Sequence, residues 1–153
     1  MEARALALKL ATRHGTRNPF HIADELGCIT VFAPLVDIRG FHQHVKRRNI
    51  IYINDSLDAR QQSLVCAHEL AHLLLHRGMN RIFMDHHTQI VTQKFENEAH
   101  QFSLELLYSD EALLPFLGRP IPDAAAFMGV PEPLAQYRMN TVQPTLWPAE
   151  FDF

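Results

Sequence analysis

The spacing of hydrophobic and polar positions along the chain predicts where its helices and strands lie. Where apolar residues recur every three or four positions between glycine or proline breaks, the pattern predicts a helix. Six segments fit this pattern: residues 2–13, 19–27, 57–77, 93–108, 122–128 and 132–139. Short apolar, β-branched runs predict three strands, at residues 28–32, 38–45 and 49–54. Three short strands in succession favour a small antiparallel sheet, and the order of elements is that of an α+β domain.

Breaks in this pattern set the expected boundaries of the domain. Residues 79–92, between the two longest helices, show no clear period and are expected to form a loose connection. Seven of the nine prolines lie between Pro115 and Pro148, so the last quarter of the chain must consist of short elements. A length of 153 residues fits one domain. We therefore expect a single domain over residues 1–140 and an irregular, proline-rich tail over 141–153.

Composition narrows the class of protein. Fourteen Lys and Arg against 17 Asp and Glu give a formal charge of −3, which argues against a strongly basic nucleic-acid binder. The chain contains no apolar run as long as a membrane span, and its first ten residues lack the pattern of a signal peptide. Cys28 and Cys66 are too few for a disulfide framework. These features predict a cytoplasmic protein that binds neither nucleic acid nor membrane directly.

The candidate chemistry lies in the helix predicted at residues 57–77, which contains the run HELAH at 68–72. His68 and His72 are one helical turn apart, so both imidazoles can reach the same ion. Zn²⁺ accepts neutral imidazole nitrogen and keeps an open position in catalytic sites. Glu69 is offset by about 100°, which suits a general base rather than a third ligand. The apolar flanks of the helix argue against an exposed surface helix that carries these residues by chance.

A third protein ligand has two possible sources. His76 lies one further turn along the same helix, but three successive turns diverge too far to converge on one tetrahedral ion, so we interpret it as a helix-end residue. The next helix supplies Glu96 and Glu98, whose carboxylates can face the first helix while neighbouring apolar residues pack into the core. The residue pattern alone does not choose between these two glutamates.

With these residues in view, the chain resembles the ImmA/IrrE family of metallopeptidases. The resemblance is carried by HELAHLLLH at residues 68–76 and by KFENEAHQF at 94–102, followed by LELL at 104–107. Segments 15–27 and 50–54 also resemble phage-type members, so the resemblance covers most of the chain. It implies an α+β fold in which the small sheet packs on a zincin-like pair of helices.

The resemblance implies that Glu96 is the third zinc ligand. Glu98 is the alternative, because Asn-Glu-Ala also resembles the ligand segment of thermolysin-like enzymes. Two positions depart from the family pattern: His100 stands where asparagine is usual, and Tyr108-Ser109 follows the leucine pair. His100 is one turn from Glu96, so we expect it to orient a ligand or to approach the metal itself.

The expected function is that of a zinc-dependent endopeptidase in which Glu69 activates the attacking water. By resemblance, its substrate is a separately encoded helix-turn-helix repressor of a phage or mobile element. The alternative, from a different functional class, is an interaction module that sequesters a repressor or antitoxin without cutting it. An intact Glu69 favours the enzyme, because a pure binder needs no base beside a metal.

Several further residues receive weaker assignments. Candidates for an additional donor to the oxyanion are His42, His44, Tyr52, His87 and His100. An extended substrate can pair with the exposed edge of the strand at 41–45. Cys66 precedes His68 by two residues and so points about 200° away, which predicts a buried thiol rather than a ligand.

Overall fold

The fold is that of a computed structural model, which describes residues 2–76 and 88–144, the side chains of 88–92 excepted. The chain forms two compact units, Met1–Leu107 and Tyr108–Phe153. The α+β class predicted from the sequence is confirmed, with three strands in the first unit and short helices in the second. The predicted single domain over residues 1–140 stays a prediction. No helix within the described ranges is long and apolar enough to cross a membrane.

Four helices build the first unit. They are α1 (Ala3–His14), α2 (Pro19–Glu25), α3 (Ala59–Leu75) and α4 (Thr88–Leu107). Helix α4 begins five residues before the start predicted from the sequence, so residues 88–92 of the expected loose connection are helical. Threonine, isoleucine and valine dominate those five positions, and their β-branched side chains lower helix propensity, which hides the helix from a pattern search. The rest of that connection, residues 79–87, lies outside the described residues.

The sheet contains β1 (Ile29–Ala33), β2 (Gly40–Val45) and β3 (Arg48–Asn54) in the order β1-β3-β2. Strands β2 and β3 form an antiparallel hairpin, whereas β1 pairs with β3 in parallel. The prediction of an entirely antiparallel sheet is therefore wrong for β1. The six residues between β1 and β2 leave space for β3 to lie between those two strands. Asn54 stabilises this connection, because its side-chain amide donates to the carbonyls of Leu35 and Ile38, each at 3.0 Å.

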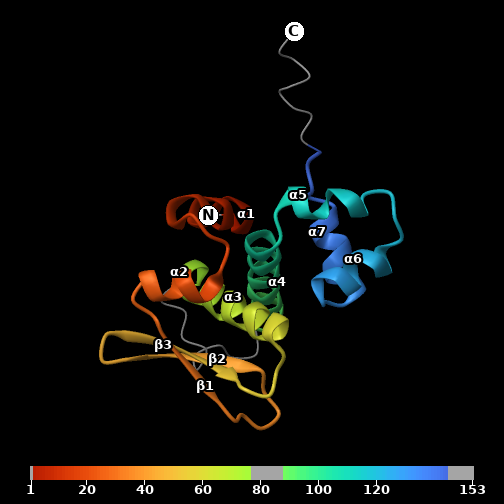
Figure 1. Cartoon of the computed structure of the whole chain (residues 1–153). Coiled ribbons are helices and arrows are strands. Elements are labelled where there is room, and N and C mark those ends of the chain that lie inside the picture. The colour runs from red at the N-terminus through yellow and green to blue at the C-terminus, as the bar shows by residue number, and fades with distance from the viewer. Residues whose placement is uncertain (1, 77–87, 145–153) are drawn as a thin grey trace. The chain divides into compact units, whose positions relative to one another are not determined.

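Helix α3 lies at the centre of the first unit, where it packs against α4, α2 and the strands β2 and β3 (Figure 1). Its buried residues join Ile51 and Ile53 of β3 and Phe102 and Leu106 of α4 in one hydrophobic core. The HELAH run therefore lies between the sheet and α4, on a helix that is held on several sides.

Gly40, the first residue of β2, permits a close approach between the strand and α3. A Cβ atom built at this position would overlap Cγ1 of Val65 and lie 2.6 Å from the carbonyl oxygen of Tyr52. Real Cβ atoms do not come so near to other heavy atoms, so a larger residue would require a backbone shift. Glycine thus allows β2 to run directly alongside the helix that carries the motif.

Two arginines connect the N-terminal elements to α4. Arg4 of α1 forms an ion pair with Glu105 of α4, whose carboxylate has no exposed surface. Arg17 donates to the backbone carbonyls of Glu105 and Leu106, at 2.9 and 3.1 Å. Carbonyls in the last turn of a helix lack intrahelical partners, so Arg17 satisfies groups that would otherwise be unpaired. These contacts fix α4, and with it the position of Glu96.

The second unit consists of short helices, as predicted from its prolines. They are α5 (Asp110–Leu113), the 3₁₀ helix η2 (Leu114–Phe116), α6 (Ile121–Met128) and α7 (Glu132–Met139). The sequence pattern predicts α6 and α7 to within one residue but misses the first two. Arg138 is buried in this unit, where it donates to the Asp110 carboxylate and to the Tyr108 carbonyl, both at 2.8 Å. Most of the expected tail, residues 145–153, lies outside the described residues.

Candidate metal centre

Local sequence explains why α3 presents its histidines on one face. The helix begins after Asp58, whose side chain accepts a hydrogen bond from the Gln61 backbone N–H at 2.8 Å. No proline or glycine interrupts the next 17 residues. His68 and His72 therefore lie one turn apart, as their spacing predicts.

Glu96 of α4 bridges these two imidazoles. Its Oε2 lies 2.9 Å from Nε2 of His68, and its Oε1 lies 2.9 Å from Nε2 of His72. The two Nε2 atoms are 3.2 Å apart. Hydrogen bonds from both imidazoles are the main cause of a pKa far below the usual range for the Glu96 carboxyl group. Two nitrogens and a carboxylate thus converge on one small volume between α3 and α4.

His100 adds a fourth donor, one turn further along α4. Ligand atoms of His68, Glu96 and His100 all lie within 4.8 Å of one another, and the His68 and His100 rings are 4.5 Å apart between centroids. Burial, followed by the proximity of His68, lowers the pKa of His100 to about 4. Its imidazole is therefore neutral at neutral pH and can offer a lone pair or a single N–H.

The chemistry of this donor set fits a divalent metal ion. Neutral imidazole nitrogen and carboxylate oxygen are the ligands that zinc combines in its catalytic sites. The predicted ligands His68, His72 and Glu96 converge, and His100 lies within reach of the same point. Within the ranges that the structure describes, His68, Glu96 and His100 are the one group of three such residues whose ligand atoms all lie close enough to hold an ion, and His72 adjoins this group through His68 and Glu96.

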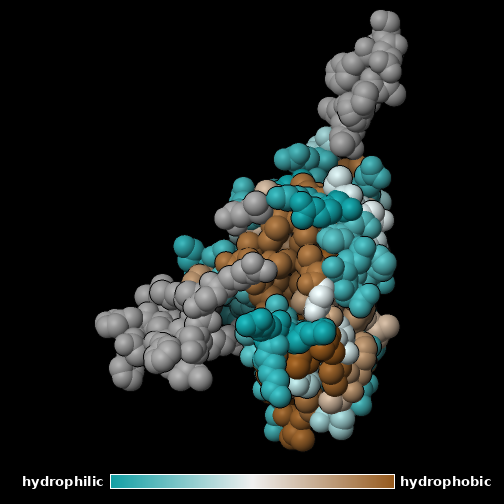
Figure 2. All heavy atoms as spheres, turned by 90° about the vertical axis from the view of Figure 1, so that its left-hand side faces the viewer, coloured by the Kyte–Doolittle hydropathy of each residue, from teal (hydrophilic) through white to brown (hydrophobic). Residues whose placement is uncertain are grey.

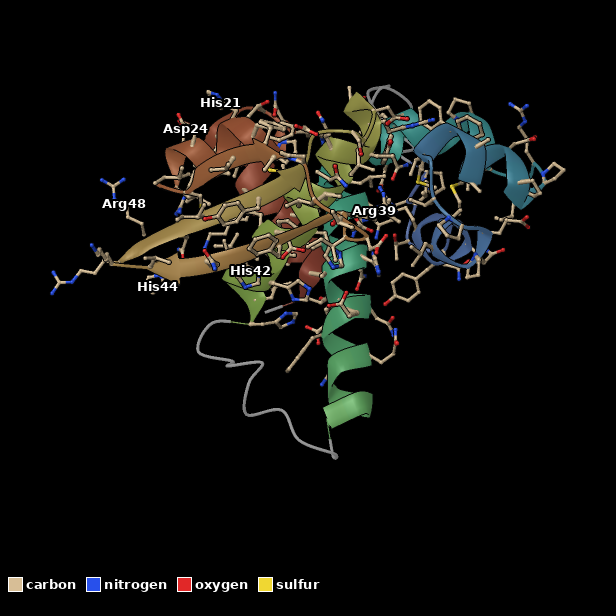
Figure 3. The ribbon with its side chains drawn as sticks, turned by 90° about the horizontal axis from the view of Figure 1, so that it is seen from below. His21, Asp24, Arg39, His42, His44 and Arg48 are labelled. Atoms are coloured by element: carbon tan, nitrogen blue, oxygen red, sulfur yellow. The ribbon has the colours of Figure 1, made fainter. Side chains whose placement is uncertain are left out.

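Glu69 is also buried, and it contacts a residue that the motif does not name. Its Oε1 accepts a hydrogen bond from Nδ1–H of His42 on β2 at 2.7 Å, and Figure 3 shows His42 beside α3. Burial by itself would raise the pKa of Glu69. The hydrogen bond from His42 and the nearby imidazoles outweigh burial and lower this pKa below its ordinary value. Glu69 is consequently a carboxylate, able to accept a proton.

His76 and Glu98 lie on the Nδ1 side of His72, opposite the Nε2 atom that faces Glu96. His76 is the residue that ends α3, as predicted, yet it is buried and its Nδ1 lies 2.9 Å from Nδ1 of His72. The Glu98 carboxylate lies 3.8 Å from Nε2 of His76. Glu98, the alternative third ligand, thus faces His76, whereas Glu96 contacts both motif histidines. A helix-end histidine has no sequence pattern that would reveal this contact.

The other candidate donors have partners elsewhere. The Tyr52 hydroxyl donates to Gln43, and its ring stacks on Phe41 at 4.4 Å. His44 pairs with Asn49 at the exposed end of the β2–β3 hairpin. His87 lies outside the described residues. The Cys66 thiol has no exposed surface, and burial, with smaller contributions from Cys28 and Glu69, raises its pKa to about 12.

Comparisons with known proteins find one family model and two relatives for this chain. Residues 23–140 match the family model described as the IrrE N-terminal-like domain, Peptidase_M78. The chain is 32% identical over 138 residues to uncharacterized immunity region protein 2 of Bacillus phage phi105, an alignment that covers 88% of this chain and 87% of the phage protein. It is 30% identical over 135 residues to the metallopeptidase ImmA of Bacillus subtilis (strain 168), with 84% and 79% covered.

Proposed function

Because the chain belongs to the IrrE N-terminal-like family of metallopeptidases, we propose that it is a zinc-dependent endopeptidase with a regulatory protein as its substrate. His68, His72 and Glu96 are the proposed ligands. The observation that carries this proposal is that each imidazole Nε2 lies 2.9 Å from one oxygen of the Glu96 carboxylate and that the two Nε2 atoms are 3.2 Å apart. Glu98 is less suitable as third ligand because its carboxylate faces His76.

Zinc, when bound, would polarise the scissile carbonyl and make a water molecule more acidic. The proton transfers belong to Glu69. Its Oε1 is held by His42, so Oε2 takes the proton from the attacking water and returns it to the departing amine nitrogen. His100, neutral at neutral pH, is placed in the mechanism as a donor to the carbonyl oxygen as negative charge develops there.

The edge of β2 is the proposed binding surface for the substrate backbone. Within the part of the chain that the structure describes, β2 pairs with β3 on one side only, so its other edge offers N–H and C=O groups to an extended chain. Val36 and Ile38 precede this strand and are 83% and 47% exposed, which provides apolar contact surface beside it. Figure 2 shows hydrophobic side chains gathered between hydrophilic ones on the face that it views.

We further propose that the substrate is a separately encoded helix-turn-helix repressor. The phage relative is named for an immunity region, and the Bacillus subtilis relative is named as a metallopeptidase. A peptidase encoded in an immunity region would have a clear role if it inactivates the repressor that maintains immunity. Repressors act on DNA in the cytoplasm, so this substrate places the reaction in that compartment.

Glu69→Gln tests the proposal. Glutamine fills the same volume but cannot accept the proton, so cleavage of a repressor encoded beside this gene should fall by roughly 100- to 10,000-fold. Zinc content should stay near one ion per chain, because Glu69 is not a proposed ligand. Cleavage is followed by intact-mass spectrometry of the repressor, with His21→Gln on the exposed surface of α2 as the matched control.

An unchanged cleavage rate in Glu69→Gln would refute the assigned base. The interaction-module alternative makes a different prediction, since a protein that only sequesters the repressor should relieve repression equally well with either residue. Absence of zinc from untagged protein, even after incubation with the metal, would remove the hydrolase proposal itself.

A further inference from the structure

The side chains of His72 and His76 form an imidazole pair in the interior of the first unit. Their Nδ1 atoms are 2.9 Å apart, and 5% and 8% of the two residues is exposed. A second hydrogen bond connects the same two residues, because the backbone N–H of His76 donates to the His72 carbonyl at 3.1 Å. Phe95 packs on the His76 ring at 4.2 Å between centroids, which restricts rotation of that ring.

This geometry dictates where the protons lie. A neutral imidazole carries one N–H and one lone pair, so only one of the two facing Nδ1 atoms can donate. The Nε2 atom of His72 faces Glu96 and His68, where a metal ligand needs its lone pair. The proton of His72 must then lie on Nδ1 and point at His76.

His76 consequently accepts at Nδ1 and keeps its own proton on Nε2. Among the described residues, that buried Nε2 atom has no hydrogen-bond partner, and the Glu98 carboxylate is 3.8 Å away. The hydrogen bond from His72 to His76 therefore has a fixed direction, away from the metal position, and the Glu98 carboxylate lies just beyond hydrogen-bond distance on the far side of His76. In many metal sites a carboxylate or a carbonyl accepts directly from the ligand imidazole. Here a second imidazole lies between the ligand and the carboxylate.

We propose that His76 is a positioning residue, which holds His72 with its Nε2 lone pair toward the metal, and that the charge of Glu98 favours the His76 tautomer whose proton is on Nε2. This inference rests on the proposed function, because it takes His72 as a ligand. It assigns different roles to the two glutamates of α4, with Glu96 in contact with the ion and Glu98 behind the ligand.

Two substitutions of His76 separate hydrogen bonding from packing. Asparagine carries a carbonyl oxygen that can accept the Nδ1–H of His72, whereas leucine fills similar space and accepts nothing. Zinc affinity of the full chain, measured by competition with a chromophoric chelator, should fall roughly 10- to 100-fold in His76→Leu. His76→Asn should recover most of that loss, and Glu98→Gln should show a smaller one.

A second readout needs no substitution. Nitrogen-15 NMR of the zinc-loaded wild-type chain should show His72 with its proton on Nδ1 and its Nε2 shifted by the metal. Equal zinc affinity in His76→Leu and wild type, or equal losses in the leucine and asparagine variants, would overturn the positioning role. So would an NMR spectrum in which His72 binds through Nδ1.

The outcomes also distinguish this inference from the proposed function. If wild type binds zinc and His68→Ala does not, the metal site stands, and an unaffected His76→Leu then rejects only the role of His76. If wild type binds no zinc, both proposals fail together. Where His76→Leu does not fold, His76→Asn and the wild-type NMR spectrum still decide.

Discussion

At the scale of single residues, burial decides which of two neighbouring side chains can react. Cys66 and His68 are two positions apart on α3, and the helix directs them to different surroundings. The Cys66 thiol lies in the hydrophobic core with no exposed surface, and its pKa is raised to about 12. His68 faces Glu96 and His100 at the edge of that core.

Cys66 should therefore resist thiol reagents in the folded protein. At pH 8 a pKa of about 12 lowers the thiolate fraction on the order of a thousandfold relative to a free cysteine, and burial blocks access as well. We expect no labelling of Cys66 by a water-soluble disulfide reagent until denaturant is added, as measured by peptide mass spectrometry. Labelling of the native protein at the rate of a free thiol would contradict the buried position.

The motif residues can be predicted from the sequence, but most of the residues that contact them cannot. The spacing of His68 and His72 fixes a shared helical face, because the helical period is local. His42 lies 27 positions before Glu69, and only the pairing of β2 beside β3 and α3 brings the two together. No local pattern carries that information. His76 was predicted at a helix end, where most histidines are solvated, and the position of α4 buries it instead.

At the scale of secondary-structure elements, the buried ion pair between Arg4 and Glu105 ties α1 to α4. The Glu105 carboxylate has no exposed surface, and the Arg4 side chain is 19% exposed. Removing one member takes this ion pair from the other charge in a poorly hydrated place, which costs more than the pair itself contributes.

Glu105→Gln should lower the free energy of unfolding by about 3 kcal/mol, measured by urea denaturation. The matched control is Asp123→Asn in the exposed Arg119–Asp123 pair, where the change should stay below about 0.5 kcal/mol. Equal effects of the two substitutions would show that the Arg4–Glu105 pair contributes no more than a surface pair.

The elements themselves were largely predictable, but their pairing was not. Alternating and β-branched runs located all three strands within two residues, since these signals are local. Which strand is central depends on contacts far apart in sequence. The sequence of β3 holds one clue, the continuous apolar run of residues 50–53, which is typical of a strand that the rest of the molecule covers.

At the scale of the whole molecule, the proposed ligands come from two helices that the chain joins only through residues 76–87. An ion held by His68 and His72 of α3 and by Glu96 of α4 would link helices that also form the core. Binding would then stabilise the folded first unit, because the unfolded chain does not hold its ligands together.

Zinc should accordingly raise the thermal unfolding midpoint of the chain. At free zinc one hundred times the dissociation constant, the expected gain is about 2.7 kcal/mol. Differential scanning calorimetry with and without zinc measures it, and His68→Ala should show little change. An identical increase in this variant would mean that zinc stabilises the protein from another position.

The close approach at Gly40 has a consequence for how the protein can vary. The distance between His42 and Glu69 depends on how near one strand lies to one helix, and a hydrogen atom at residue 40 sets that separation. Glycine at this position therefore gives the smallest possible distance between β2 and α3. Any thicker residue would move β2 outward and lengthen the His42–Glu69 contact without altering either chemical group. The geometry of the proposed catalytic site is thus adjustable from a residue that takes no part in the proposed chemistry.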